Sequence, residues 1–426
     1  MTTDEYKPRV IDRLLSRKLQ GKGAVLIEGA KWCGKTSTAE QQASSVVYLS
    51  DAKRYKQYVL FADTNPEMIL DGETPRLIDE WQLAPKLWDQ IRFEVDHRSG
   101  LGHFILTGSA VPVKRDEIHH SGTGRFAWIT MRPMSLWESG DSNGAISLGH
   151  LFDSPQSIAA TNEVDLRRIA FLTCRGGWPQ ATILPDDIAL EQAFDYYDAV
   201  VNVDIQRVDD VSRDIERVKR LMRSYARFQG SQASFAEICR DMKANDQEAL
   251  NESTVYSYLT ALRHIFVVED MHAWNPNLRS KTAIRTTDTR YFVDPSIATA
   301  ALSLGPDDLL NDLESFGLFF ETLCVRDLRV FAQALDGEVF HYRDKTGLEC
   351  DAVVHLRNGS YGLIEIKLGG DRLIEEGSKT LQALSSKIDT TRMKSPSFLM
   401  ILTATGSFAY RREDGVYVVP IGCLKD

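Results

Sequence analysis

Residues 24–37 read Ala-Val-Leu-Ile-Glu-Gly-Ala-Lys-Trp-Cys-Gly-Lys-Thr-Ser and decide the fold of the first part of the chain. The apolar run at the start of this stretch predicts a buried strand that breaks at Gly29, and a helix opens at Gly34-Lys35-Thr36. A strand, the pattern G-x-x-x-x-G-K-[ST] and a helix, in that order, are typical of a loop whose backbone N–H groups surround a phosphate. We therefore expect a nucleotide to bind here.

The residue types of the loop suit this ligand. Gly34 allows a close approach of the backbone to a phosphate. Lys35 would neutralise the β- and γ-phosphates, and Thr36 would place a hydroxyl on Mg²⁺. The sequence thus predicts ATP or ADP with Mg²⁺ as ligand, and the residues of the phosphate loop are Gly29, Ala30, Lys31, Trp32, Cys33, Gly34, Lys35, Thr36 and Ser37.

Composition narrows the class of protein. The chain has 426 residues, of which 43% are hydrophobic and 26% charged, as in ordinary multidomain globular proteins. The net charge of −10 argues against a protein coated in nucleic acid but leaves room for a local basic face. Six cysteines without C-x-x-C spacing favour a reducing compartment. The sequence has no signal-peptide pattern and no apolar stretch that would span a bilayer, so we expect a cytoplasmic protein without a membrane partner.

Acidic and polar residues follow two further predicted strands. Leu77-Ile78 delivers Asp79 and Glu80, and a second strand ends in polar residues that include Thr107 and Ser109. In a phosphate-loop ATPase, Asp79 would hold Mg²⁺ through water and Glu80 would polarise the attacking water. Thr107 and Ser109 are candidates to lie between the loop and the acidic pair, where they would sense the γ-phosphate. The alternative is an acidic strand end without a catalytic role.

Five blocks of sequence, taken together, resemble the prokaryotic AAA-type ATPases whose C-terminal half is the domain of unknown function DUF4143. The resemblance covers nearly the whole chain. It implies an α/β multidomain fold: an AAA+-like P-loop core at 1–140, a helical lid or linker at 141–203, a winged helix at 204–304 and a restriction-nuclease-like domain at 305–426. The blocks are residues 29–36, 77–85, 104–109, 124–125 and 131–139.

Arg125 ends one of these blocks. An arginine at this place could act as a finger that reaches a γ-phosphate, including one across the interface of a homo-oligomer. An ordinary surface or packing arginine is the alternative, and the sequence leaves both open.

The region 204–304 has the order helix, turn, helix, strand that is typical of a winged helix. Ser234 and Glu237 predict a capping box, Ser253 a second cap, and residues 266–274 a strand. A helix over 254–262 would then read a DNA groove. The alternative is a winged helix that only packs between domains.

The last domain carries a second candidate chemistry. Glu365 and Lys367 are two residues apart on a predicted strand and therefore share a face, while Asp351 precedes them on a neighbouring strand. With Glu321 on an upstream helix, this set resembles the PD-(D/E)XK nuclease arrangement. The carboxylates would hold Mg²⁺ or Mn²⁺, and Lys367 would orient or activate water. Alternating surface charge on a strand is the plainer interpretation.

The leading hypothesis is an ATP-hydrolysing, Mg²⁺-dependent enzyme that couples its nucleotide state to the binding or cleavage of nucleic acid. A nucleotide-gated DNA-binding regulator with an inactive nuclease domain is a second hypothesis. An ATPase switch that acts on a protein partner is a third.

Overall fold

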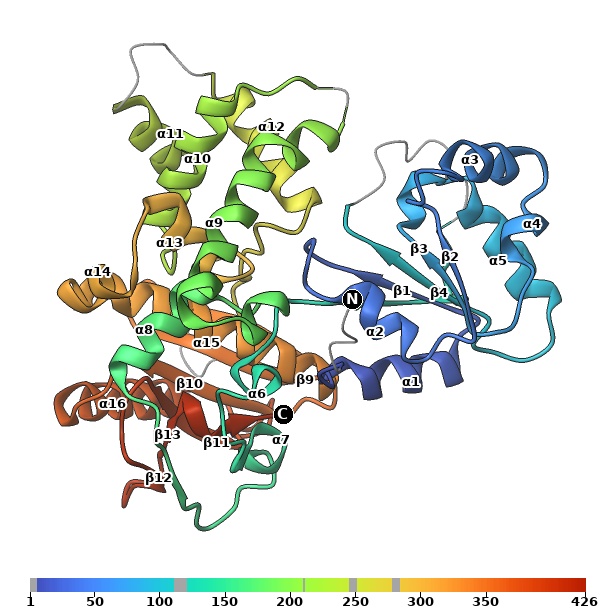
Figure 1. Cartoon of the computed structure of the whole chain (residues 1–426). Helices are drawn as coiled ribbons and strands as arrows, with labels where there is room; N and C mark the ends of the chain where they lie inside the picture. Colours follow the sequence, from blue (N-terminus) through green and yellow to red (C-terminus); the bar gives the residue numbers. More distant parts are fainter. Residues whose placement is uncertain (1–5, 111–120, 210, 245–250, 278–283) are drawn as a thin grey trace. The chain divides into compact units, whose positions relative to one another are not determined.

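The computed structural model describes residues 6–110, 121–209, 211–244, 251–277 and 284–426 (Figure 1). The contacts of the chain divide these described residues into two compact units. Unit 1 takes its residues from 1–133, 203–212 and 261–267, and unit 2 from 134–202, 213–260 and 268–426. This grouping is coarser than the four predicted domains, because most of 141–304 packs together with 305–426. The finer boundaries stay a prediction.

The described part of unit 1 contains a five-stranded parallel sheet with the strand order β2-β3-β4-β1-β5. The three strands predicted at Val25-Leu26-Ile27, at Leu77-Ile78 and before Thr107 are confirmed. The strands are β1 (Ala24–Glu28), β2 (Ser45–Tyr48), β3 (Arg76–Asp79), β4 (Phe104–Gly108) and β5 (Phe126–Thr130). The helices are α1 (Ile11–Gly21), α2 (Lys35–Glu40), α3 (Tyr55–Thr64), α4 (Glu67–Leu70), α5 (Leu87–His97) and the 3₁₀ helix η1 (Trp81–Leu83).

Helices cover both faces of this sheet (Figure 1). Leu26 of β1 packs in a cluster with side chains of α3, α4 and α5, whereas its neighbours Val25 and Ile27 pack in a second cluster with α1 and α2. Burial on both faces explains why the strands read as continuous apolar runs. Because β4 lies between β1 and β3, the residues that follow these three parallel strands meet at one edge of the sheet.

Helices make up the first half of unit 2. They include α6 (Leu136–Ser139), α7 (Leu148–Leu151), α8 (Leu166–Arg175), α9 (Asp186–Asn202), α10 (Ile215–Arg227), α11 (Phe235–Ala244), α12 (Glu252–His264, whose last residues count with unit 1), α13 (Pro295–Leu302), α14 (Pro306–Asn311) and the 3₁₀ helix η3 (Gln180–Ile183). Helix α13 is buried along most of its length and packs against α8, α9, α10 and α15 (Leu313–Ala334). It therefore joins the middle of the chain to the C-terminal domain within one core.

The region predicted as a winged helix shows three helices, α10 to α12, followed by two isolated antiparallel bridges, Val268 with Phe292 and Met271 with Thr289. The capping box of Ser234 and Glu237 is confirmed. Two details differ from the prediction. Residues 266–274 pair only at single residues and do not form the continuous strand that was predicted. Helix α12 begins at Glu252, and the side chain of Asn251, not that of Ser253, accepts a backbone N–H at its start.

Within the described residues of unit 2, a seven-stranded mixed sheet has the order β7-β12-β13-β11-β10-β9-β8. Helix α15 packs against β8, β9 and β10, and α16 (Asp371–Lys387) packs against β9, β10 and β11. The edge strand β7 comes from residues 160–161, far upstream of its partner. The strands are β7 (Ala160–Thr161), β8 (Gly337–Arg343), β9 (Glu349–Leu356), β10 (Tyr361–Lys367), β11 (Phe398–Thr403), β12 (Phe408–Arg411) and β13 (Tyr417–Pro420), while β14 (Leu424–Lys425), after the 3₁₀ helix η5 (Ile421–Cys423), pairs with β6 (Ile146–Ser147).

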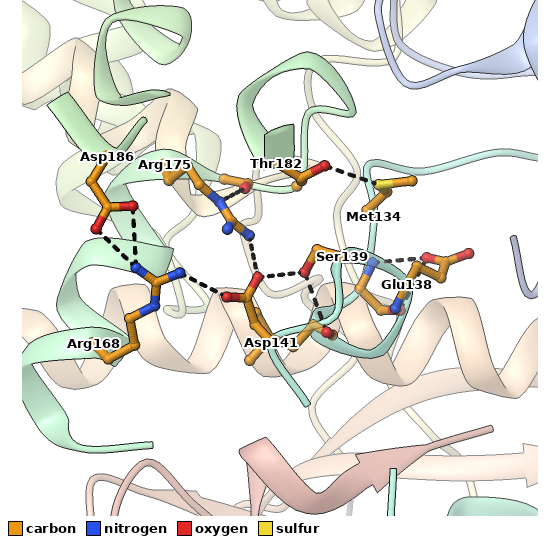
Figure 2. A network of polar contacts seen from close by, with 12 residues as sticks. Met134, Glu138, Ser139, Asp141, Arg168, Arg175, Thr182 and Asp186 are labelled. Carbon is orange, nitrogen blue, oxygen red and sulfur yellow. Dashed lines mark hydrogen bonds and ion pairs between the residues drawn. The ribbon is translucent and has the colours of Figure 1, made fainter. Parts of the chain in front are cut away.

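A polar network fixes the first residues of unit 2 (Figure 2). Asp141 accepts from Arg168 at 2.9 Å and from Arg175 at 2.8 Å, both on α8, and Ser139 adds a hydroxyl at 2.7 Å. Burial alone would raise the pKa of Asp141, but the two arginines outweigh it and hold this pKa below its ordinary value. The block at 131–139, recognised in the sequence, thus ends in a segment that is firmly attached to α8.

Candidate functional site

The phosphate loop follows β1 directly, as predicted. Gly29 has φ 153°, and a Cβ there would lie 2.0 Å from the carbonyl oxygen of Met131, so no larger residue fits. Gly34 has φ 101° and caps α2. Trp32 also lies in the left-handed region, with φ 64°, and its side chain is 54% exposed. The loop conformation is therefore set by tight backbone geometry at its root and at the start of α2.

Lys35 is buried against its own loop. Its Nζ donates to the carbonyl oxygens of Gly29 at 2.9 Å and Ala30 at 2.8 Å. These two carbonyls accept the hydrogen bonds from Lys35 Nζ that phosphate oxygens would accept in a nucleotide complex. A bound phosphate has to replace them, and its negative charge makes it the stronger acceptor.

The end of β3 carries the predicted acidic residue next to the loop. Oδ1 of Asp79 accepts from the hydroxyls of Thr36 at 2.6 Å and Thr107 at 2.7 Å. Asp79 and Thr107 are buried. The structure thus brings together residues of α2, β3 and β4, as expected from neighbouring parallel strands, and sets the hard oxygens of Thr36 and Asp79, which suit Mg²⁺, side by side.

Glu80 follows in a left-handed conformation, with φ 56°. Its Oε2 accepts from the Ser109 hydroxyl at 2.9 Å and from the amide of Gln82. Its backbone N–H donates to Thr107 Oγ1 at 3.3 Å. Both polar residues at the end of β4 therefore contact the acidic pair, Thr107 through Asp79 and Ser109 through Glu80.

Two contacts of the phosphate loop could not be predicted from the sequence. Lys31 Nζ lies 2.5 Å from Asp204 Oδ1, on the 3₁₀ helix η4 (Asp204–Arg207), which belongs to unit 1 although it follows α9. The buried Arg9 donates to the carbonyl oxygens of Cys33 at 2.7 Å and Arg132 at 2.8 Å. Neither pairing has a local signal, since 173 residues separate Lys31 from Asp204. The residue types alone gave no reason to join them.

Within one chain, Arg125 lies far from the phosphate loop. Its carbonyl oxygen accepts from the N–H of Ala24, at the start of β1, whereas the loop follows the end of β1, roughly 15 Å away for a strand of this length. Its guanidinium pairs with Asp96 of α5 at 2.7 Å. The prediction that Arg125 acts as a finger within one subunit is therefore wrong, because Arg125 lies at the end of the sheet where β1 begins, opposite the phosphate loop. A role across a subunit interface stays a prediction.

The four residues of the second candidate site do come together in unit 2. The register pairs Ala352 of β9 with Ile364 of β10, which sets Asp351 beside Glu365. Lys367 Nζ bonds Asp351 Oδ2 at 3.0 Å and Glu365 Oε2 at 2.7 Å. Glu321, from α15, is close enough to interact electrostatically with all three. We call these four residues the acidic cluster.

Burial dominates the electrostatics of the acidic cluster. It raises the pKa of Glu321 and of Glu365, each to about 8, and the charge of Asp351 adds to both shifts. Burial alone would lower the pKa of Lys367, but Asp351 and Glu365 raise it above its ordinary value. Glu365 Oε1 is buried and has no hydrogen-bond partner among the described residues.

Residues 6–110, 121–209, 211–244, 251–277 and 284–426 contain neither a ready-made metal cluster nor a membrane-spanning helix. No group of three or more His, Cys, Asp and Glu side chains in these ranges is arranged to hold a metal ion by itself. None of the helices in the same ranges combines the length and the apolar character of a bilayer-spanning segment.

Several basic residues that precede the predicted DNA-reading helix contact acidic or aromatic side chains of the same unit. On α10, Lys219 pairs with Glu216, and Arg227 pairs with Asp241 of α11. Before α10, the buried Arg213 lies over the ring of Tyr258, 5.8 Å from its centroid. Tyr256 of α12 is exposed, whereas Tyr258 is buried. A DNA-reading role for α12 stays a prediction.

Comparison with known proteins places three family models along the chain. Residues 21–139 match an AAA domain, 166–308 a domain of unknown function, DUF8612, and 316–424 another, DUF4143. Uncharacterized proteins of Mycobacterium tuberculosis and Mycobacterium bovis are each 23% identical over 356 residues, which is 83% of this chain and 72% of theirs.

Two solved structures are more distant. A Walker-type ATPase of Pyrococcus abyssi is 13% identical, with 71% of this chain and 97% of that chain covered and a TM-score of 0.44. A signal transduction ATPase with numerous domains and a tetratricopeptide repeat sensor, from Pyrococcus horikoshii, is 14% identical, with 78% and 52% covered and a TM-score of 0.22. At such TM-scores neither likeness bears on function. The family models and the loop geometry agree on the domains: the chain contains an AAA-type P-loop domain at 21–139 and a DUF4143 domain at 316–424.

Proposed function

We propose that this protein binds ATP with Mg²⁺ at the phosphate loop, hydrolyses it, and couples the nucleotide state to a cation-dependent, nuclease-like acidic cluster in its C-terminal domain. The observation that carries the first part is the contact of Thr36, Asp79 and Thr107 at the edge of the sheet where the loop begins. This arrangement sets a hydroxyl and a carboxylate beside a phosphate-binding helix start, as ATP hydrolysis requires.

Each residue then has a role in hydrolysis. Lys35 would exchange its two loop carbonyls for β- and γ-phosphate oxygens, and Thr36 and Asp79 would hold Mg²⁺. Mg²⁺ held there would stabilise the negative charge on the phosphate oxygens. Glu80 would polarise the attacking water, while Ser109 and Thr107 hold the acidic pair in place. Lys31, a loop residue paired with Asp204, would respond to phosphate charge.

The Lys35→Ala variant tests the nucleotide site. ATP affinity should fall roughly 10- to 150-fold, because a hydrogen bond to a charged group contributes about 1.5–3 kcal/mol. Isothermal titration with a non-hydrolysable analogue and Mg²⁺ measures the change. Lys22→Ala is a matched control, since Lys22 also donates to a backbone carbonyl, that of Gly124 at 3.0 Å, at the other edge of the sheet. Equal affinity in both variants would contradict the assignment of the loop.

The second part of the proposal rests on the unpartnered, buried Glu365 Oε1. Mg²⁺ is usually held by one or two carboxylates together with waters and substrate phosphates, so it does not need a cage of three side chains. Asp351 and Glu365 would hold a divalent cation, Mg²⁺ or Mn²⁺, once Lys367 moves from between them. A divalent cation there would stabilise negative charge on a phosphodiester, and Lys367 would orient water.

A pH experiment tests the acidic cluster without a substrate. A carboxyl whose folded pKa is raised stabilises the folded state below its unfolded pKa, near 4.5, and this stabilisation is lost as the pH rises through about 8. With EDTA present, the melting temperature of wild type should therefore fall between pH 5 and pH 8, and Glu365→Gln should reduce the fall.

The control for this experiment is Glu375→Gln. Glu375 is exposed, and Arg412 holds its pKa below the ordinary value, so its replacement should leave the fall unchanged. Adding Mn²⁺ at pH 8 should stabilise wild type but not Glu365→Gln, because a cation relieves the repulsion between the carboxylates. A fall that is the same in all three proteins would mean that the acidic cluster does not titrate in this range.

Incubating the full chain with Mg²⁺ or Mn²⁺, ATP and several forms of DNA and RNA distinguishes the three hypotheses about its target. Cleavage supports the proposal as stated. Retention without cleavage supports a nucleotide-gated DNA-binding regulator, for which the helices α10 to α12 are the expected contact. If the protein neither cleaves nor retains nucleic acid, an ATPase switch that acts on a protein partner is the remaining hypothesis.

A further inference from the structure

Tyr291 connects the middle of unit 2 to the acidic cluster. It precedes α13, its side chain is fully buried, and its phenol donates to Oε1 of Glu321 on α15. We propose that Tyr291 is a positioning residue that orients Glu321 for cation binding, so that the acidic cluster is completed by the middle region of the chain. This inference rests on the cation site proposed above.

Neighbouring groups fix the phenol in place. The guanidinium of Arg329 lies 5.7 Å from the centroid of the Tyr291 ring and donates to the backbone carbonyls of Glu269 at 2.9 Å and Asp270 at 3.1 Å. The N–H of Glu269 in turn donates to the carbonyl oxygen of Tyr291 at 3.0 Å. A buried ring held by its backbone and by a cation has little freedom, so its hydroxyl is a fixed point for Glu321.

A second segment of the middle region, the turn at Gly230, lies next to Glu321. A Cβ at Gly230, three residues after the end of α10, would lie 3.6 Å from each carboxylate oxygen of Glu321. The N–H of Gly230 donates to the carbonyl oxygen of Arg290 at 2.9 Å, which ties this turn to the residue before Tyr291. Two separate segments of the middle region therefore border one side of Glu321.

The acidic cluster borders Glu321 as well, since Asp351, Lys367 and Glu365 all act on its charge. A carboxylate with one oxygen bonded to a fixed donor cannot rotate freely. Hydrogen bonds of this kind to metal ligands commonly set the orientation of the ligand. Tyr291 would therefore determine whether Glu321 can contribute to a cation held by Asp351 and Glu365.

The test uses Mn²⁺ alone as the probe, on the full chain without nucleotide. Electron paramagnetic resonance measures free Mn²⁺ and also records the spectrum of the bound ion. Tyr291→Phe, which keeps the ring, should weaken Mn²⁺ binding by roughly 10- to 100-fold, as is usual for a residue that orients a ligand, and should alter the bound spectrum. Tyr342→Phe is the matched control, because Tyr342 is equally buried and donates to a carboxylate of Asp344, at 3.2 Å, outside the acidic cluster.

A double-mutant cycle shows whether Tyr291 acts through Glu321. In a Glu321→Gln background, Tyr291→Phe should have little further effect on Mn²⁺ affinity, because the group that it orients is already changed. Full additivity, or a Tyr291→Phe protein that binds Mn²⁺ as Tyr342→Phe does, overturns the inference.

Asp351→Asn separates failure of this inference from failure of the proposed site. If Asp351→Asn loses Mn²⁺ binding while Tyr291→Phe retains it, the cation site stands and the role of Tyr291 is wrong. If wild type binds no Mn²⁺, or Asp351→Asn binds it normally, the cation site itself is wrong and the inference falls with it.

Discussion

Replacing Glu80 by glutamine should slow ATP hydrolysis by about 10²- to 10⁴-fold, the range expected when a general base is removed. The amide still accepts a hydrogen bond through its oxygen, so the contact with Ser109, 2.9 Å in wild type, can persist. It carries no charge with which to polarise water. Because Thr36 and Asp79 are untouched, ATP affinity should stay unchanged.

Phosphate release under saturating ATP measures the rate, and titration with ATP before turnover measures affinity. Glu73→Gln is a suitable control, since Glu73 is an exposed glutamate of the same unit. A variant of Glu80 that turns over like the control would move the catalytic base to another residue. A variant that loses ATP binding would show that Glu80 supports the loop and not the chemistry.

Arg326→Ala should destabilise the protein by about 3–5 kcal/mol, which is typical when one partner of a buried ion pair is removed. Arg326 is almost fully buried and bonds Asp294 at 2.9 Å and Asp327 at 2.8 Å. Asp327 also accepts from the N–H of Leu136, and Asp294 from that of Gly177. Without the guanidinium, two buried carboxylates lose their counter-charge while they hold these segments together.

The loss should be larger at pH 8 than at pH 5. Burial already raises the pKa of Asp327 to about 6, and removing Arg326 should raise it further, so that protonation at low pH relieves the unpaired charge. Urea unfolding followed by tryptophan fluorescence measures the change. Arg343→Ala, which breaks a half-exposed pair with Glu349, should cost only about 0.2–1 kcal/mol. Equal losses in the two variants would contradict the structural role of Arg326.

Sequence patterns predicted the part of the site that depends on neighbouring strand ends. A parallel sheet brings such ends to one edge, and so Thr107 could be expected near Asp79 before any coordinates were known. The alternation of residues on a strand likewise placed Glu365 and Lys367 on one face. In both cases a regular backbone geometry converts spacing in the sequence into proximity.

Other contacts depend on how separate elements dock, for which spacing is uninformative. Asp204 reaches Lys31 from a segment beyond α9, and Tyr291 reaches Glu321 from outside the C-terminal domain. Arg125 follows a loop and was therefore a candidate arginine finger, but it lies just before β5, where it pairs with Asp96. Side chains that meet through tertiary packing leave no periodic signal, and they account for most of what was missed.

The edge of the C-terminal sheet has a consequence for synthesis. Strand β7 pairs with β12, and the adjoining Asn162 donates to the carbonyl of Gly406, 244 residues later. A ribosome that adds about 5–20 residues per second needs roughly 10–50 s to make the intervening chain. During that interval the nascent β7 has no partner strand. We therefore expect this edge to stay unpaired in newly made chains, and open to chaperones, until β12 has emerged from the ribosome.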